Sequence, residues 1–181
     1  MTDDVLPVRV PDSELWQQMR SEWLHLLTAA EDRIKHCMCQ LTDEQLWWRP
    51  FDGGNSIGNQ ILHVCGNLQQ WLVDGIRGSV SLRDRSAEFS ATGGKTSAEL
   101  RSTLRGVFDT IREVLAALSN AELTESRTIQ GFQVTVLGAI CHSIPHLVGH
   151  THQITLLTRL QLRERYQFHW TPDGDRSSVP L

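Results

Sequence analysis

The chain has 181 residues, of which 40% are hydrophobic and 21% charged, with a formal net charge of −4. This length and composition fit one globular domain with a full-sized core, so we expect a single domain over residues 1–181. The acidic balance and the scattered Arg and Lys exclude the concentrated basic surface of a nucleic-acid-binding protein.

The sequence also argues against a membrane or secreted protein. No uninterrupted apolar run reaches membrane-spanning length, and the acidic start, MTDDVLPVRVPD, lacks the apolar core of a secretory signal. The four cysteines, at positions 37, 39, 65 and 141, form no C-x-x-C motif. We therefore expect reduced thiols in a cytoplasmic protein.

The first predicted element is a helix over residues 13–39. Asp12 is the expected N-cap, because it follows a proline and precedes apolar residues at helical spacing. His25 and His36 fall on the opposite side of the predicted helix, so we expect both to be exposed. The apolar face contains Leu15, Met19, Trp23, Leu26, Leu27, Ala30, Ile34 and Cys37.

A second helix is predicted over residues 56–76, after a linker at 40–55. Residues 53–73 carry no charged side chain, yet they include a polar stripe at helical spacing. Solvated helix faces normally carry charges, so an uncharged polar stripe indicates groups that face the protein interior. The stripe consists of Ser56, Asn59, His63, Asn67 and Gln70.

The third predicted helix follows a loop at 77–95 and ends near residue 118. Thr96 or Ser97 is the expected cap, with Glu99 placed for a capping box with Thr96. The connector at 119–133 contains Gly131 and has the composition of a short extended turn.

The fourth predicted helix, residues 134–163, is the most informative. Residues 128–158 contain no charged side chain but four histidines. His146, His150 and Gln153 share one face at 3.6 residues per turn. The two histidines have Cβ atoms about 5–6 Å apart, which allows both imidazoles to bind one ion. His152 points away, and His142 is two turns from His150.

Two further features of this helix bear on its role. Pro145 removes a backbone hydrogen bond, so it either kinks the helix next to His146 or is a tolerated bend. Apolar residues occupy nearly the whole circumference, which predicts burial on more than one side and favours a homodimer.

Four amphipathic helices predict an all-α four-helix bundle over about residues 13–165, followed by an irregular tail at 166–181. If the second and fourth helices are neighbours, His63 can face His146 and His150. Three neutral histidines would leave a coordination position open, as in catalytic metal sites. Asn59, Asn67 and Gln153 would then support the ligands or bind substrate. Hydrogen-bonded histidines in a core or dimer interface explain the same pattern equally well.

The chain resembles the DinB/YfiT-like superfamily, and most closely its uncharacterised bacterial branch. The resemblance covers about residues 13–165. It rests on His63 followed by His146-x-x-x-His150-x-x-Gln153, and on further segments in the same order. These are Leu46-Trp-Trp-Arg-Pro50, Asn55-Ser-Ile-Gly58, His63-Val-Cys-Gly-Asn67, Gln70-Trp71, Arg83-Asp-Arg85, Glu88-Phe89 and Arg127-Thr-Ile-Gln-Gly131.

The resemblance implies a four-helix bundle, often dimeric, with a divalent metal held by His63, His146 and His150. We expect Zn²⁺ or Ni²⁺, with Mn²⁺ or Fe²⁺ as alternatives. It also implies a thiol-dependent S-transferase or related enzyme that activates a low-molecular-weight thiol at the metal. His152 departs from the pattern, because many relatives have Gly at that position.

Three functions follow from these observations. The favoured one is a metal-dependent transferase acting on a small-molecule substrate. The others are a hydrolase that uses the same three histidines, and a non-enzymatic dimeric binding module. His142 is a neighbour of the expected site. Arg49, Arg83 and Arg85 lie in loops from which they would reach an acidic substrate group, although solvated loop arginines explain them as well.

Overall fold

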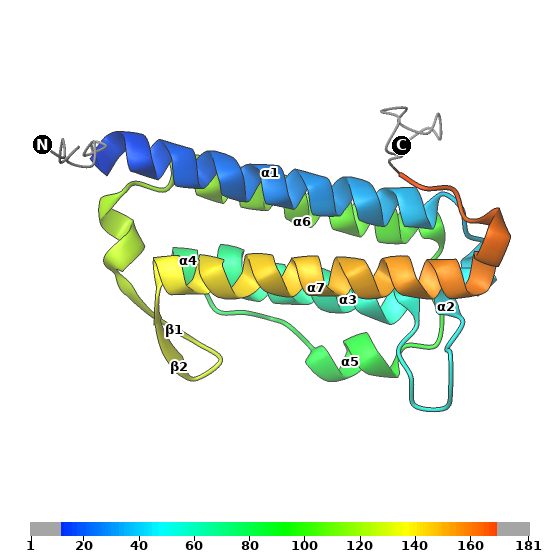
Figure 1. The fold of residues 1–181 in the computed structure, drawn as a ribbon. Helices are drawn as coiled ribbons and strands as arrows, with labels where there is room; N and C mark the ends of the chain where they lie inside the picture. Colours follow the sequence, from blue (N-terminus) through cyan, green and yellow to red (C-terminus); the bar gives the residue numbers. More distant parts are fainter. Residues whose placement is uncertain (1–11, 170–181) are drawn as a thin grey trace, which may run out of the picture.

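The computed structural model describes residues 12–169, and four long helices dominate it (Figure 1). They are α1 (Asp12–Met38), α3 (Ile57–Leu68), α6 (Ser97–Ala117) and α7 (Val136–Leu162). The predicted all-α bundle is confirmed, with the addition of one small two-stranded sheet. None of the helices in the described part has the length and apolar character needed to cross a bilayer.

Each long helix packs against two others. Both α1 and α3 contact α6 and α7, so α1 and α3 lie diagonally across the bundle. In Figure 1, α1 and α7 run in one direction, whereas α3 and α6 run in the other. Because α3 and α6 are parallel neighbours, the chain between them must return along the whole bundle. The crossover at residues 78–96 makes this return.

The helix starts follow from their capping residues. Ser56 and Thr96 each form a capping box, with Asn59 and Glu99 respectively. Thr135 caps α7 by accepting from the Gly138 N–H. Asp12 is the first residue of α1 rather than its N-cap, so the prediction at that position was off by one residue.

A π-helical segment, η1 (Gln69–Asp74), continues α3 and leads into α4 (Gly75–Arg77). The three elements together cover the predicted helix at 56–76. A π-helical turn contains one residue more than an α-helical turn and therefore changes the direction of the side chains beyond it. Gln70, which accepts a hydrogen bond from Arg83, and Trp71, whose ring packs on His142, belong to this segment.

Several short elements occupy the predicted loops. The linker contains α2 (Asp43–Trp47), and the crossover contains α5 (Arg85–Ser90). The connector holds the 3₁₀ turn η2 (Ala121–Thr124) and a hairpin of β1 (Ser126–Ile129) and β2 (Phe132–Thr135). Its two-residue turn, Gln130-Gly131, has positive φ at both residues, as expected where Ile129 pairs with Phe132. A last 3₁₀ turn, η3 (Arg163–Arg165), follows α7.

His36 is buried, which contradicts the predicted surface position; His25 is exposed as expected. The irregular segment after η3 covers His36, whose Nε2 lies 2.6 Å from the carbonyl oxygen of Gln167. Helical periodicity could not reveal this burial, because the covering residues come from the far end of the chain. Residues 166–169 are irregular as predicted, and the rest of the predicted tail lies outside the described residues.

Candidate metal centre

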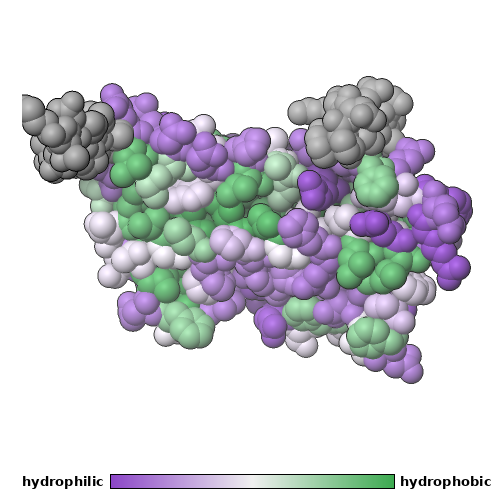
Figure 2. All heavy atoms as spheres, in the orientation of Figure 1, coloured by the Kyte–Doolittle hydropathy of each residue, from purple (hydrophilic) through white to green (hydrophobic). Residues whose placement is uncertain are grey.

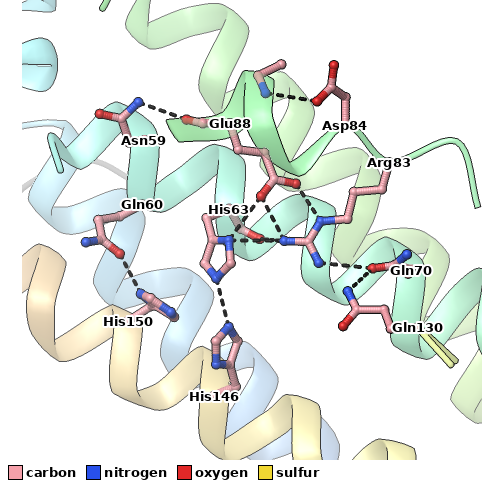
Figure 3. A network of polar contacts seen from close by, with 11 residues as sticks. Asn59, Gln60, His63, Gln70, Arg83, Asp84, Glu88, Gln130, His146 and His150 are labelled. Carbon is pink, nitrogen blue, oxygen red and sulfur yellow. Dashed lines mark hydrogen bonds and ion pairs between the residues drawn. The ribbon is translucent and has the colours of Figure 1, made fainter. Parts of the chain in front are cut away.

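Three histidines from two helices converge where α3 and α7 pack side by side in opposite directions (Figure 3). One ring nitrogen from each of His63, His146 and His150 lies within 4.8 Å of the others. His63 is buried, whereas His146 and His150 are partly exposed. The cluster therefore opens toward the surface on the α7 side. Figure 2 shows hydrophilic residues gathered along the middle of α7 on this face.

Glu88 fixes the orientation of His63. The Nδ1 of His63 lies 3.0 Å from the Glu88 Oε2, and its Nε2 lies 3.1 Å from the Nε2 of His146. Arg83 Nη2 is also 3.0 Å from that Nδ1, but a guanidinium only donates, so the Nδ1–H is assigned to the carboxylate. This tautomer leaves the Nε2 lone pair of His63 facing the cluster, the arrangement of carboxylate–histidine–metal triads.

Gln60 plays the corresponding role for His150. The Nδ1 of His150 donates to the Gln60 side-chain oxygen, which leaves its Nε2 as the lone-pair nitrogen. Gln60 is buried on α3, one residue away from the polar stripe recognised in the sequence. A buried amide in an uncharged helix was the available signal, but sequence reasoning passed over it.

Arg83 pairs with Glu88 through two contacts, Nε to Oε1 at 2.6 Å and Nη2 to Oε2 at 2.8 Å. Its Nη1 donates to the Gln70 side-chain oxygen at 3.1 Å, and Gln130 at the hairpin tip donates to the same oxygen. Burial opposes ionisation of Glu88, but the hydrogen bonds from Arg83 and His63 outweigh it and lower the pKa of the carboxyl. Glu88 is therefore an anion at neutral pH.

Gly66 leaves the space that this ion pair occupies. A Cβ at this position would lie 2.0 Å from the Glu88 Oε1 and 2.9 Å from the Arg83 Nε. Only glycine allows the carboxylate to approach α3 closely enough to reach His63. The Arg83–Glu88 pair was absent from the sequence-based site, although both residues belong to the segments that carry the family resemblance.

The cluster is electrostatically suited to bind a cation. Burial, together with the neighbouring His150 and His63, lowers the pKa of His146 to about 4. Burial and the nearby His63 also lower the pKa of His150. Both rings are therefore neutral at pH 7, as a metal ligand must be. With His63 they form a set of three imidazole donors, which fits Zn²⁺ and Ni²⁺.

The other histidines of α7 lie around the cluster. His142 is exposed and stacks between Trp71, at 4.1 Å between ring centroids, and His146, at 5.9 Å. Gln153 is exposed and lies near enough to His150 to oppose slightly the lowering of the pKa of that ring. His152 faces α1 and lines a small cavity there. In Figure 1, α7 continues through Pro145 as one helix.

The remaining predicted site residues have different positions. Asn59 donates from its side chain to the Glu88 and Ala91 carbonyls, at 2.8 and 2.7 Å, and so holds α5 against α3. Arg49 donates to the Ala91 and Phe89 carbonyls, both at 3.0 Å, and supports the same helix. Asn67 lies one turn after His63, and its buried Oδ1 accepts no hydrogen bond within the described residues.

The chain has the fold of DinB-like four-helix proteins, and His63, His146 and His150 form a group that could hold a metal ion. A DinB-like protein from Bacillus cereus matches with a TM-score of 0.62, 18% identity, and coverage of 77% of this chain and 90% of the other. A DinB-like protein from Bacillus subtilis matches with a TM-score of 0.63, 11% identity, and coverage of 83% and 99%.

Residues 14–175 match the family described as protein of unknown function (DUF1572). This match spans most of the sequence, and the chain belongs to that family. A comparison with curated proteins finds no match.

Proposed function

We propose that this protein is a divalent-metal-dependent enzyme in which His63, His146 and His150 are the ligands. Zn²⁺ or Ni²⁺ is the favoured ion, and Mn²⁺ or Fe²⁺ the alternative. One observation carries the proposal: the cluster nitrogens of His63 and His150 are aimed by acceptors on their other ring nitrogens, Glu88 and Gln60. Core histidines are hydrogen-bonded as well, but here the supported rings direct their other nitrogens toward one point, where the ring nitrogens of three histidines lie within 4.8 Å of one another.

The reaction we favour is S-transfer by a low-molecular-weight thiol. A bound divalent ion supplies Lewis acidity, which favours the deprotonated form of a thiol or water. The chain's own part is to orient the histidines, through Glu88 and Gln60, and to leave the α7 side open to substrate. Asn67 Oδ1, buried and without a donor among residues 12–169, is available to accept a hydrogen bond from a bound molecule. Hydrolysis is the second candidate, because the same centre would activate water.

Metal analysis of protein purified without an affinity tag tests the ligand set. We expect about one ion per chain in the wild type and none in His146→Ala. His152→Ala is the matched control, since this residue lies on the same helix but faces α1, and it should keep the ion. Wild-type protein that cannot be loaded with Zn²⁺, Ni²⁺ or Mn²⁺ would leave the non-enzymatic binding module as the better explanation.

Turnover needs a separate screen. Metal-loaded protein is incubated with several thiols and electrophiles, and with ester and amide substrates. Thiol-dependent turnover that is lost in His146→Ala supports the transferase, whereas thiol-independent hydrolysis supports the second candidate.

We also propose a cytoplasmic homodimer. All four cysteines are free, which suits a reducing compartment. The exposed Leu156 and Leu160 on α7 and Leu26 on α1 are the kind of apolar surface that a second copy covers. Sedimentation that gives a monomer at every concentration contradicts the dimer.

A further inference from the structure

The arginines around the three-histidine centre differ in whether their N–H groups already have hydrogen-bond or ion-pair partners. The side chain of Arg83 is buried and paired with Glu88, and Arg49 donates to two backbone carbonyls of the crossover. Arg85 is exposed and makes neither an ion pair nor a hydrogen bond within residues 12–169. Of these three cations, only Arg85 keeps its full hydrogen-bonding capacity for a ligand.

Arg85 is held close to the centre by an aromatic ring. Phe89 is half-buried and packs on His63, with 4.7 Å between ring centroids. The Arg85 guanidinium carbon lies 5.0 Å from the centroid of Phe89. Stacking on a ring engages the face of a guanidinium and leaves its N–H edges available. Arg85 is thus a cation held near His63, because both side chains pack on the ring of Phe89.

The support for this arrangement is rigid. Arg85 and Phe89 are one turn apart in α5, and Asn59 and Arg49 both bind backbone carbonyls at the end of that helix. A small shift of α5 would break these contacts. The position of Arg85 relative to the histidines is therefore set by the fold and not by the side chain alone.

The surrounding charge favours an anion. Residues 53–73 and 128–158, which supply the α3 and α7 faces of the centre, carry no charged side chain. The charge of Glu88 is balanced by Arg83. Asp84 caps α5 by accepting from the Ala87 N–H, and in Figure 3 it points away from the histidines. A divalent ion on the three histidines, together with Arg85 on the far side of the Phe89 ring, would make the surroundings of His63 positively charged.

We propose that Arg85 determines substrate charge: it binds the carboxylate of a small acidic molecule whose other end reaches the three-histidine centre. The geometry suits a two-point ligand, because the guanidinium fork can donate two hydrogen bonds to a carboxylate while the three-histidine centre binds the reactive group. This inference rests on the proposed function. It names the class of substrate as small anionic thiols or electrophiles rather than neutral ones.

Matched thiol probes test the inference. Zinc-loaded protein, with its zinc content measured first, is titrated by calorimetry with 3-mercaptopropionate, 2-mercaptoethanol and cysteamine. These probes carry the same thiol beside an anionic, a neutral and a cationic group. A charge-assisted hydrogen bond of the usual strength predicts that the wild type binds the acid at least about tenfold more tightly than the alcohol. Cysteamine should bind most weakly.

Three variants assign the preference. Arg85→Gln should weaken binding of the acid at least about tenfold and leave the alcohol unchanged. Arg85→Lys keeps the charge without the planar fork and should recover part of the loss. Arg105→Gln removes the same charge from an exposed site on α6, the helix diagonal to α7, and should change neither.

Each other result overturns the inference. If zinc is bound but the wild type does not prefer the acid, Arg85 has no such role, while the metal proposal stands. Equal losses of affinity for the acid in Arg85→Gln and Arg105→Gln would show that the preference comes from the net charge of the protein. If the wild type takes up no zinc, the proposed function fails and this inference fails with it. The zinc measurement made beforehand separates the first case from the last.

Discussion

Gly66 is the residue at which one added methyl group would disturb the centre. Its Cβ would occupy the position of the Glu88 carboxylate, so Gly66→Ala should push Glu88 away from His63. Loss of a partner that orients a metal ligand usually costs 10–100-fold in metal affinity, and we expect a loss of about that size. Competition with a chelator of known affinity measures it.

Gly106 provides the matched control. It is a helical glycine on α6, and an added Cβ meets nothing within 4 Å. Gly106→Ala should leave the metal affinity unchanged and stabilise the fold by about 0.5–1 kcal/mol. If both variants lose metal equally, the Gly66 effect does not act through Glu88.

The cysteines offer a second test at the residue scale. Burial, with the nearby Glu88 adding to it, raises the pKa of Cys65 to about 12, and burial also raises the pKa of Cys37. Only the thiolate is alkylated, so both should resist iodoacetamide at pH 8, whereas the exposed Cys141 should react. Mass spectrometry of the native protein shows the order in which the cysteines are alkylated. Early modification of Cys65 would mean that α3 opens readily.

At the same scale, sequence reasoning selected the histidines but missed the groups that orient them. His63, His146 and His150 stand out because they lie in uncharged helices at helical spacing. Glu88 and Arg83 come from the crossover, and their placement depends on a tertiary contact with Gly66. No periodic pattern in one sequence encodes such a contact.

Among the elements, α1 and α6 are joined by a buried carboxylate. Glu31 is 2% exposed and pairs with Lys35, at 2.6 Å, and with Arg112 on α6. Both cations are partly exposed, so after removal of Glu31 water can hydrate them, and neither becomes a buried charge without a partner. We therefore expect Glu31→Ala to lower the free energy of unfolding by about 1–3 kcal/mol. This is the usual range for the loss of hydrogen bonds between charged groups.

Urea denaturation measures this change, and Asp109→Asn is its control. Asp109 also contacts Arg112, at 3.0 Å, but it is exposed. Its loss should change the stability by less than about 0.5 kcal/mol. A comparable loss in both variants would show that Glu31 acts through general charge balance instead of a link between helices.

Long helices were predictable and short elements were not, for a physical reason. Thr96 begins α6 as its capping box predicts. In contrast, α5 has six residues and no periodicity, and it exists because Asn59 and Arg49 bind its last carbonyls. The face of α1 was also partly misjudged, since Leu15 and Leu26 are exposed while Trp16 is buried against Trp23. Apolar residues cover a wide arc of α1, and periodicity alone could not predict which part of that arc faces the core.

For the whole molecule, the helix order explains how a simple bundle acquires a site. Parallel α3 and α6 require the long crossover at residues 78–96, and this crossover brings Arg83 and Glu88 to His63 on α3. It also carries Arg85, which packs on the same Phe89 ring as His63. The hairpin before α7 adds Gln130, which donates to the same Gln70 oxygen as Arg83. The bundle supplies the histidines, and the irregular connections supply what orients them.

A metal held between α3 and α7 should stabilise the entire fold, since its ligands are brought together only in the folded chain. At a free-ion concentration about 100 times the dissociation constant, the gain is about 2.7 kcal/mol, equivalent to about 5–10 °C in Tm for a domain of this size. Differential scanning fluorimetry with Zn²⁺, and after removal by a chelator, measures the shift. His146→Ala should lose it and His152→Ala should retain it. Equal shifts in these two variants would place the bound ion elsewhere and argue against the three-histidine centre.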